Sequence, residues 1–414
     1  MKNSWFLSVL TAQTVFLSSL FALTLDTGSI VQVNTNEDSR PFGYNETFAA
    51  SSEAVVWLDE RNPSGVPQLY GIRMDDPNRT EFLIDPYVPW ANGVKISGSR
   101  ALYKSEDFPS PNVLRVADIQ NPASPQILTI QPNINVSVFD INGPWIAYAG
   151  SGESTEYRDI VTAADVSDFQ NPQTYRIAEL PENAYVSSLA LESPYLVWIE
   201  YTGEGGTAKI ADLTNPAAPS IQSVPLPENF YLESIRVSDN ALIGRAWYGW
   251  EVVLCLVRDY RAPHWTIQRI RPGGILDEYL HSGPRLDGPF AVWVTTARAP
   301  AFLDDSEPRN ESGWKLKAVS IYNLGNIVTL LNTPYENEIG FADIAGRQIV
   351  WSQEETYIQA DLFQAALELE CGDWGYKPGD INKDCRVDLE DLACLSRNWL
   401  SCTTPDQPDC QLGS

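Results

Sequence analysis

Histidine is almost absent from this chain, since only His264 and His281 occur among 414 residues. So few imidazoles leave little room for a histidine-rich metal site or a catalytic triad built on histidine. Basic residues are also scarce, with 28 Lys and Arg against 54 Asp and Glu, and the net charge is −26. A chain this acidic repels nucleic acids and anionic membrane surfaces, so we expect no nucleic-acid partner.

Cysteine is nearly confined to the end of the chain. Five of the six cysteines fall in residues 371–414, at Cys371, Cys385, Cys394, Cys402 and Cys410. Dense cysteines in a short terminal segment of an exported chain indicate disulfides. Because five is odd, one is left over, and we choose Cys394 because it occupies an apolar position of an expected helix. Cys255 lies in a hydrophobic run and is expected to be a small buried strand residue.

The amino terminus resembles an export signal. Lys2 precedes a largely apolar stretch over residues 5–23, which predicts a secretory signal peptide over residues 1–22 and a secreted or cell-surface protein. The alternative is an uncleaved transmembrane anchor, which the polar Thr11, Gln13 and Thr14 disfavour. After cleavage, we expect no integral membrane segment.

A short phrase recurs seven times along the chain. It consists of two or three small or turn residues, two apolar residues and then usually an aromatic residue, as in Leu191-Glu-Ser-Pro-Tyr-Leu-Val-Trp198. Its last position falls at Trp57, Tyr103, Tyr148, Trp198, Gly244, Trp293 and Trp351. These positions are 46, 45, 50, 46, 49 and 58 residues apart. Such a period is typical of radial or linear repeat folds, and each phrase fits a tight turn that leads into a strand.

Further hydrophobic runs before and after each phrase complete a unit of four antiparallel strands. Proline-containing hairpins such as Val116-Ala-Asp-Ile-Gln-Asn-Pro122 separate the third and fourth strands. The pattern predicts an all-β protein, with a seven-bladed β-propeller over residues 29–365. The seventh unit has only one further strand after its phrase, over residues 356–360. We therefore expect residues 29–34 to supply its outer strand and close the ring.

The units resemble the repeats of exported bacterial propellers of the TolB/WD40-like kind. The resemblance is strongest where Val56-Trp-Leu-Asp-Glu-Arg61 is followed by Gln68-Leu-Tyr-Gly-Ile72. The Asp-x-x-Asn-Pro hairpins also resemble those of LVIVD-type surface repeats. This resemblance covers residues 29–365 and implies a fold rather than an activity, because such propellers serve as enzymes, binding modules and scaffolds.

One face of the expected propeller carries acidic and aromatic side chains, because the loops between second and third strands share it with the loops between blades. Within blades, these loops hold Asp59, Glu60, Glu106, Asp107, Glu153, Glu156, Asp159, Glu204, Glu251, Asp304, Asp305, Glu307, Glu311, Glu354 and Glu355. Between blades, they hold Glu182, Glu228, Asp277, Glu278, Glu336 and Glu338 with Tyr87, Trp90, Tyr185, Tyr231, Tyr279 and Tyr335. Flat rings and carboxylate acceptors suit a glycan or a protein partner. The plain alternative is solvated acids and locally packed tyrosines.

Three functions stay open. The favoured one is a secreted, non-catalytic propeller that binds a glycan or protein partner through this face, with the long loop at residues 295–314 as a recognition loop or lid. The rival is a polysaccharide-degrading hydrolase or lyase, which needs two converging carboxylates or a carboxylate beside His281. A lone loop histidine is more often exposed and idle, and His264 is expected in solvent at the opposite hairpin. The third is a purely structural surface protein.

The most specific motif lies near the carboxyl terminus, at residues 380–391. Its twelve residues place oxygen ligands at positions 1, 3, 5, 7, 9 and 12, from Asp380, Asn382, Asp384, the backbone of Arg386, Asp388 and Asp391. This spacing is that of an EF-hand loop, and the hard oxygen ligands predict Ca²⁺. The following helix over residues 389–400, without an entering helix, resembles one repeat of a type I dockerin.

The dockerin resemblance implies a calcium-dependent docking module over residues 371–414, with a cohesin-like or cell-surface partner. Two departures weaken the cohesin expectation. A dockerin ordinarily has two such repeats, and position 6 holds Cys385 where glycine usually makes the turn. A disulfide from Cys385 to Cys371 or Cys402 could hold that turn instead.

Overall fold

The computed structural model describes residues 22–35, 41, 46–89, 93–105, 113–130, 134–152, 158–203, 205–249, 251–270, 278–297, 313–321, 324, 327–334, 337–356, 359–370 and 392. The chain divides into two compact units. Asp26–Ala366 forms one, and Met1–Leu25 with Leu367–Ser414 forms the other. Within the described residues, no helix has the length and apolar character that crossing a membrane requires.

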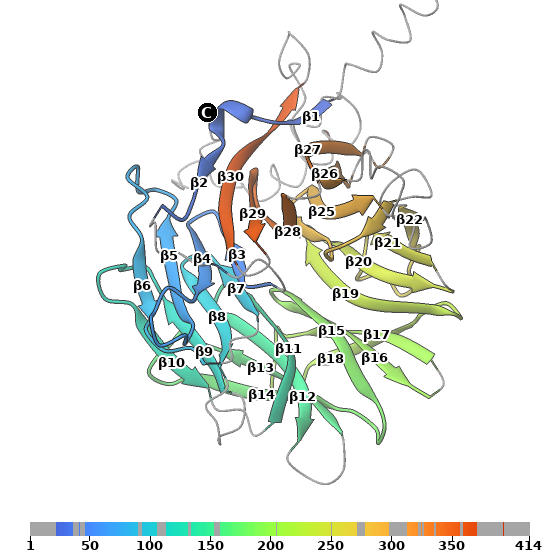
Figure 1. Ribbon diagram of the computed structural model, residues 1–414. Helices are drawn as coiled ribbons and strands as arrows, with labels where there is room; N and C mark the ends of the chain where they lie inside the picture. Colours follow the sequence, from blue (N-terminus) through green and yellow to red (C-terminus); the bar gives the residue numbers. More distant parts are fainter. Residues whose placement is uncertain are drawn as a thin grey trace, which may run out of the picture. The chain divides into compact units, whose positions relative to one another are not determined.

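The larger unit consists of antiparallel sheets built from strands that follow one another in sequence, except in blade 7, where an amino-terminal strand joins the sheet (Figure 1). Blades 1 and 2 contain β3 (Phe48–Ala50), β4 (Ala54–Asp59), β5 (Gln68–Arg73), β6 (Phe82–Asp85), β7 (Val94–Ser97), β8 (Arg100–Ser105), β9 (Val113–Asp118) and β10 (Gln126–Ile130). Blades 3 and 4 contain β11 (Ile134–Asn142), β12 (Trp145–Gly152), β13 (Asp159–Asp165), β14 (Gln173–Glu179), β15 (Tyr185–Glu192), β16 (Tyr195–Thr202), β17 (Gly205–Asp212) and β18 (Ser220–Pro225).

The remaining blades also consist of consecutive strands. Blade 6 has two short strands in place of its innermost strand, and blade 7 has only three consecutive strands. Blade 5 contains β19 (Phe230–Ser238), β20 (Ala241–Tyr248), β21 (Glu251–Val257) and β22 (Gln268–Ile270). In blade 6, β23 (Glu278–Leu280) and β24 (Arg285–Asp287) both pair with β25 (Phe290–Ala297), which β26 (Gly313–Ser320) and β27 (Val328–Pro334) follow. Blade 7 contains β28 (Glu338–Ala345), β29 (Gln348–Thr356) and β30 (Gln359–Glu370).

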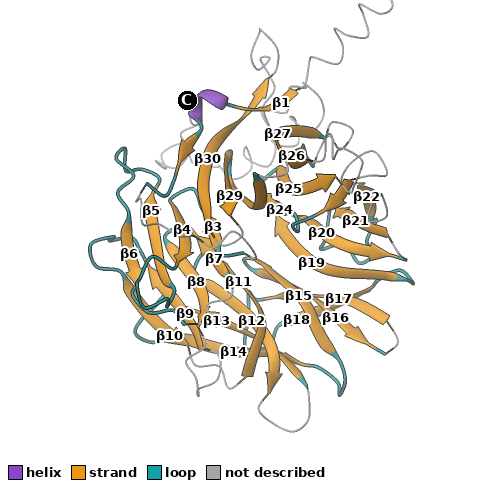
Figure 2. Cartoon of the chain, in the orientation of Figure 1, coloured by secondary structure: helices purple, strands orange, loops and turns teal. Residues whose placement is uncertain are grey.

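The innermost strands form a closed ring. β3, β7, β11, β15, β19, β24 and β28 contact one another in that order, and β28 returns to β3. Figure 2 shows that the larger unit is built from strands, and among its described residues the one short helix is the 3-10 turn Thr27–Ser29. The predicted all-β, seven-bladed β-propeller is therefore confirmed.

The amino-terminal segment closes the ring, as predicted. β2 (Val31–Gln32) pairs with β30, placing Val31 opposite Gln364. The pairing continues beyond β2, because Val33 N donates to Leu362 O at 2.7 Å. The expected third strand of blade 7 was placed wrongly, since residue 356 ends β29 and β30 runs to Glu370. In the smaller unit, β1 (Ala22–Leu25) pairs with the last four residues of β30.

In blades 1 to 4 and in blade 6, the aromatic residue that ends the phrase fills the space between its blade and the preceding one. Trp57 packs in blade 1 against blade 7, and Trp198 packs in blade 4 against blade 3. Both are at most 1% exposed, and burial of such a ring stabilises by roughly 2 kcal/mol or more. Gly244 breaks the aromatic pattern because a Cβ there would lie 2.6 Å from the carbonyl oxygen of Ser234.

The phrase spans eight residues, for example 191–198. The side chain at its second position can join a blade to the next one, and we call these side chains the staples. Six of the seven junctions have one. At the first junction, Ser51 Oγ donates a hydrogen bond to Gly98 O. At the other five, a backbone N–H of the later blade donates to the side chain of the earlier one: Gly143 to Ser97, Ser193 to Asn142, Asn240 to Glu192, Gly288 to Ser238 and Gly346 to Asp287. The junction from blade 7 to blade 1 has Ala345 at this position and instead packs Phe341 edge-on against Phe48, with ring centroids 5.0 Å apart.

Candidate functional site in the central channel

The position directly before the phrase is charged in five of the seven blades. The five side chains are Lys95, Asp140, Arg236, Arg285 and Asp343, and we call them the charge ring. In each of these blades, this residue pairs with the one just before the last position of the phrase. Equal register on the innermost strands places the five side chains at one level of the channel.

The two carboxylates of the charge ring bind neighbouring blades. Asp140 Oδ2 accepts a hydrogen bond from Leu191 N of blade 4, and Asp343 Oδ2 accepts one from Ala50 N of blade 1, both at 2.9 Å. Burial raises the pKa of Asp343, although Arg285 opposes the shift. Blades 4 and 1 are the two that lack a charge at this level, so these carboxylates have a structural role there.

The three cations of the charge ring converge on Glu46, which precedes β3. Glu46 Oε1 lies 2.6 Å from the Nη2 atoms of both Arg236 and Arg285, and Oε2 lies 2.6 Å from Lys95 Nζ. The φ angle of Glu46 is 56°, a left-handed value that costs a non-glycine residue energy and persists only where contacts hold it. Blades 2, 5 and 6 thus bind one carboxylate together.

The electrostatics of this cluster favour the charged carboxylate. Burial alone would raise the pKa of Glu46, but Arg285, Lys95 and Arg236 together hold it well below its usual range. Burial and the neighbouring Arg236 lower the pKa of Lys95 to about 8, against the opposing pull of Glu46. The pKa of Arg285 is lowered by burial and by Arg236. Three crowded cations therefore surround one carboxylate.

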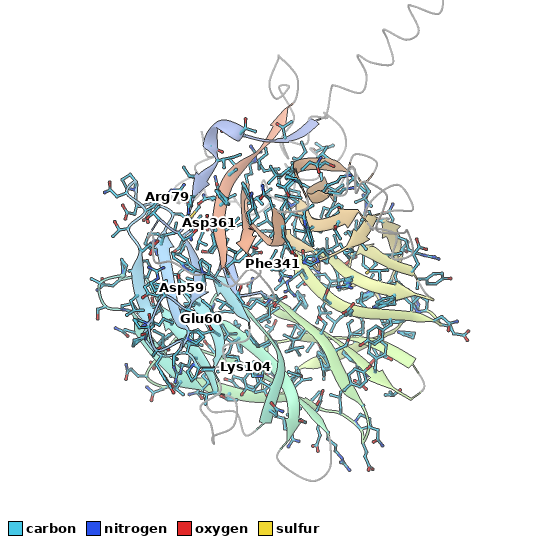
Figure 3. The ribbon with its side chains drawn as sticks, in the orientation of Figure 1. Asp59, Glu60, Arg79, Lys104, Phe341 and Asp361 are labelled. Carbon is cyan, nitrogen blue, oxygen red and sulfur yellow. The ribbon has the colours of Figure 1, made fainter. Side chains whose placement is uncertain are left out.

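A cavity of about 560 Å³, which we call the chamber, opens on one side of this cluster. Its lining includes two further cations, Lys104 and Arg245, and only one further carboxylate, Glu233. The Arg245 Nε atom lies 3.1 Å from Glu233 Oε2. Figure 3 shows Phe341, another lining residue, toward the middle of the ring.

A second cavity of about 300 Å³ shares Lys95, Arg236 and Arg285 with the chamber. It is lined by residues that come later on the innermost strands, and its carboxylates are Asp140, Asp287 and Asp343. Cations therefore outnumber carboxylates in the chamber, whereas the second cavity has three of each.

Two buried serine hydroxyls of the chamber have no hydrogen-bond partner among the residues that the structure describes. These are Ser234 Oγ and Ser282 Oγ, and Ser282 is 8% exposed. A buried hydroxyl without a partner is uncommon, and an unfilled polar site for water or a ligand is one explanation. Ser188, by contrast, is satisfied, because its Oγ accepts a hydrogen bond from Ile235 N at 3.0 Å.

His281 lies at the chamber and is not an idle surface residue. Its Nε2 atom is 3.6 Å from Glu338 Oε1, and its ring packs edge-on against Trp314. Burial and the charge of Arg245 lower the pKa of His281, while burial raises the pKa of Glu338. The imidazole is therefore neutral at pH 7. His264 is exposed, as predicted.

Three tyrosines of blades 4 and 5 form a stack that we call the tyrosine ladder. The ring centroids of Tyr185 and Tyr201 are 5.8 Å apart, and those of Tyr201 and Tyr231 are 4.5 Å apart. Tyr185 is 46% exposed. The sequence had singled out Tyr185 and Tyr231 and missed Tyr201, which belongs to the strand β16. None of the three tyrosines lines the chamber, but Tyr185 and Tyr231 each lie two residues before a residue that does, Ser187 and Glu233.

Two of the expected loop acids are buried structural groups. Asp59 is 0% exposed and binds Arg61 at 2.6 Å, in the blue first blade (Figure 3). Asp159 accepts a hydrogen bond from Val186 N at 2.7 Å, and burial raises its pKa. Glu60 is half-buried, while Glu182, Glu228 and Glu251 are exposed. The prediction of an open acidic face is therefore wrong for Asp59 and Asp159.

Many of the remaining predicted side chains lie outside the described residues. They are Glu106, Asp107, Glu153, Glu156, Glu204, Asp277, Asp304, Asp305, Glu307, Glu311, Glu336, Trp90 and Tyr335, with the side chains of Glu278, Tyr279, Glu354 and Glu355. The predicted calcium ligands Asp380, Asn382, Asp384, Arg386, Asp388 and Asp391 also lie outside them. Among the residues that are described, no three His, Cys, Asp or Glu side chains could hold a metal ion together. Cys255 is 1% exposed and free, as expected, and burial raises its pKa to about 12.

No protein-family model and no curated protein matches this sequence. The fold is similar to the β-propeller domain of the Trilobed protease from Pyrococcus furiosus, with 12% identity, a TM-score of 0.53 and coverage of 81% of this chain and 97% of that one. An acylaminoacyl peptidase from Pyrococcus horikoshii matches with 9% identity and a TM-score of 0.54, over 79% of this chain and 52% of that one. A prolyl endopeptidase matches with 12% identity and a TM-score of 0.55, over 92% and 55%. The chain thus spans about half the length of these two peptidases, and the likeness shows the fold alone.

Proposed function

We propose that this protein is an exported, non-catalytic propeller that binds a glycan at the chamber. The observation that carries the proposal is the chamber of about 560 Å³, lined by hydroxyls and charged side chains beside the tyrosine ladder. Sugars present hydroxyls for hydrogen bonds and apolar ring faces for stacking, so they need both kinds of surface.

The lining favours a sugar over other ligands. Most small-molecule pockets are lined mainly by apolar groups, whereas this one has charged side chains from several blades and the unpartnered hydroxyls of Ser234 and Ser282. A protein partner would need a broad complementary surface rather than an enclosed polar space. A glycan end that enters the chamber past Tyr185 could use both the polar lining, for hydrogen bonds, and the tyrosine ring, for stacking.

The carboxyl-terminal segment supplies a docking function in this proposal. Carboxylates and an amide oxygen at EF-hand spacing suit a hard cation, so residues 380–391 would hold Ca²⁺. The ion would order the loop and present the following helix to a cohesin-like or cell-surface partner. Export through a signal peptide over residues 1–22 brings the chain to that partner.

A glycan array probed with the secreted chain, in calcium and in chelator, tests the proposal. Tyr185→Ala should weaken glycan binding by about tenfold, because a stacking ring of the ladder is lost. Tyr87→Ala is the matched control, since Tyr87 is 53% exposed and stands outside the ladder. No glycan bound by the native chain, or equal losses in the two variants, contradicts the proposal.

A hydrolase or lyase acting on polysaccharide is the second candidate, and the His281–Glu338 pair favours it. A neutral imidazole 3.6 Å from a carboxylate can accept a proton. Prolonged incubation of the native chain with each bound glycan, followed by chromatography of the products, separates the two functions. Cleavage that His281→Ala and Glu338→Gln abolish would establish the enzyme, and intact glycan would exclude it.

A further inference from the structure

We propose that the chamber selects glycans that carry carboxylates, such as chains of uronic acid, and that Arg236, Arg285 and Lys95 bind the ligand carboxylate. This inference rests on the proposed glycan binding and names its chemical class. The chain has a net charge of −26, yet five cations line the chamber against the two carboxylates Glu46 and Glu233.

Glu46 shows that the three cations form a carboxylate site. Each of its contacts to Arg236, Arg285 and Lys95 is 2.6 Å long, which is typical of charge-assisted hydrogen bonds. Arg285 is 5% exposed, so the site is rigid and built into the ring. The protein itself supplies one carboxylate to this cation site, that of Glu46.

A second carboxylate fits because the three cations share only one of the carboxylates that line the chamber, Glu46. The carboxylates of the charge ring line the second cavity instead: Asp343 Oδ1 lies 3.8 Å from Arg285 Nε, and the charge of Asp140 acts on Lys95 and Arg236. Burial and cation crowding lower the pKa of Lys95 to about 8. An anion arriving from the chamber would relieve this repulsion between cations.

The chamber offers groups for the rest of a sugar acid as well. Ser282 lines the chamber together with the cations, and its buried Oγ has no hydrogen-bond partner within the described part of the chain. Ser234 Oγ has the same properties. Hydroxyls of a sugar acid can satisfy both, while the carboxylate meets the cations. The excess of cations over carboxylates in the chamber attracts an anion from that side, whereas the second cavity has equal numbers of both.

Isothermal titration of the full-length chain in calcium tests the inference with three probes. These are trigalacturonic acid, its fully methyl-esterified form and triglutamate. We expect the sugar acid to bind at least about tenfold more tightly than the ester, because a charge-assisted contact is lost, and rising NaCl should weaken only the acid. Equal binding of acid and ester overturns the carboxylate inference and leaves glycan binding intact. Equal binding of triglutamate overturns the restriction to glycans.

Variants locate the site. Arg236→Gln should lower the affinity for trigalacturonic acid by about tenfold or more, whereas Glu46→Gln should raise it, because a competing carboxylate is removed. Arg176→Gln is the matched control, since Arg176 is 55% exposed on an outer strand and removes the same charge. The salt dependence of the native chain keeps the test valid if a channel variant fails to fold. An equal loss in Arg236→Gln and Arg176→Gln contradicts the assignment.

Discussion

Replacing Glu46 with glutamine separates the stabilising role of the charge cluster from its binding role. Glutamine keeps the size of the side chain and one oxygen acceptor, but it leaves Arg236, Arg285 and Lys95 without the carboxylate that each meets at 2.6 Å. Breaking a fully buried ion pair costs about 3–5 kcal/mol. The Glu46 side chain is 37% exposed to the channel, so water screens the loss and we expect about 2 kcal/mol.

Differential scanning calorimetry converts this cost into a measurable shift. A unit the size of Asp26–Ala366 has an unfolding entropy of about 0.7 kcal/mol/K, so Glu46→Gln should lower Tm by about 3 °C. Glu53→Gln is the matched control, because Glu53 is 46% exposed and lies 3.5 Å from Arg73. Its Tm should change by less than about 1 °C, as a surface ion pair contributes little.

The pH dependence gives the sharper criterion. The pKa of Glu46 is lowered in the folded state, so its stabilisation is fully present above the unfolded pKa of about 4.3 and disappears as pH falls through the lowered value. The Tm difference between the native chain and Glu46→Gln should be constant from pH 6 to pH 5 and should shrink below about pH 4. A difference that is absent at pH 6, or that persists undiminished at pH 3, refutes the reasoning.

Three further outcomes follow. Gly150→Ala places a Cβ 2.0 Å from Asn135 O and should lower Tm by several degrees, whereas Gly203→Ala, with open space around it, should not. Chelation of calcium should lower the calorimetric transition of residues 371–414 and leave the propeller transition in place, and identical traces would exclude a calcium module. The folded Lys95, with a pKa of about 8, binds its proton more weakly than the unfolded one, so stability should rise between pH 8 and about pH 10, and Lys95→Met should remove that rise in thermal melts.

The repeat could be found from the sequence because its aromatic residue has one physical task. Trp57, Tyr103 and Trp198 each fill the space against the preceding blade, so every blade needs a large ring at the same place. Closure by residues 29–34 was predictable for a related reason, since an incomplete seventh sheet leaves an unpaired edge. The exception at Gly244 was not predictable, because it depends on the fold bringing the carbonyl of Ser234 to where a side chain would lie.

The cation site could not be found by counting acids in loops. Lys95, Arg236 and Arg285 lie within strands, one position before the phrase, where apolar residues surround them in sequence. Their register was a usable signal, since it repeats in five blades. Their convergence on Glu46 was not, because it depends on a left-handed residue outside the repeat.

The staples have a direction. In each of the six junctions, the side chain belongs to the earlier blade and its partner to the later one, as with Ser97 and Gly143. A chain leaving the ribosome therefore always presents the anchoring side chain before the turn that it will hold, and we expect blades to assemble in order of synthesis. Only the seam between blades 7 and 1, where Ala345 stands in place of a staple, must wait until β30 has been made. Six of the junctions can thus form in turn during synthesis, and the ring closes once β30 is present.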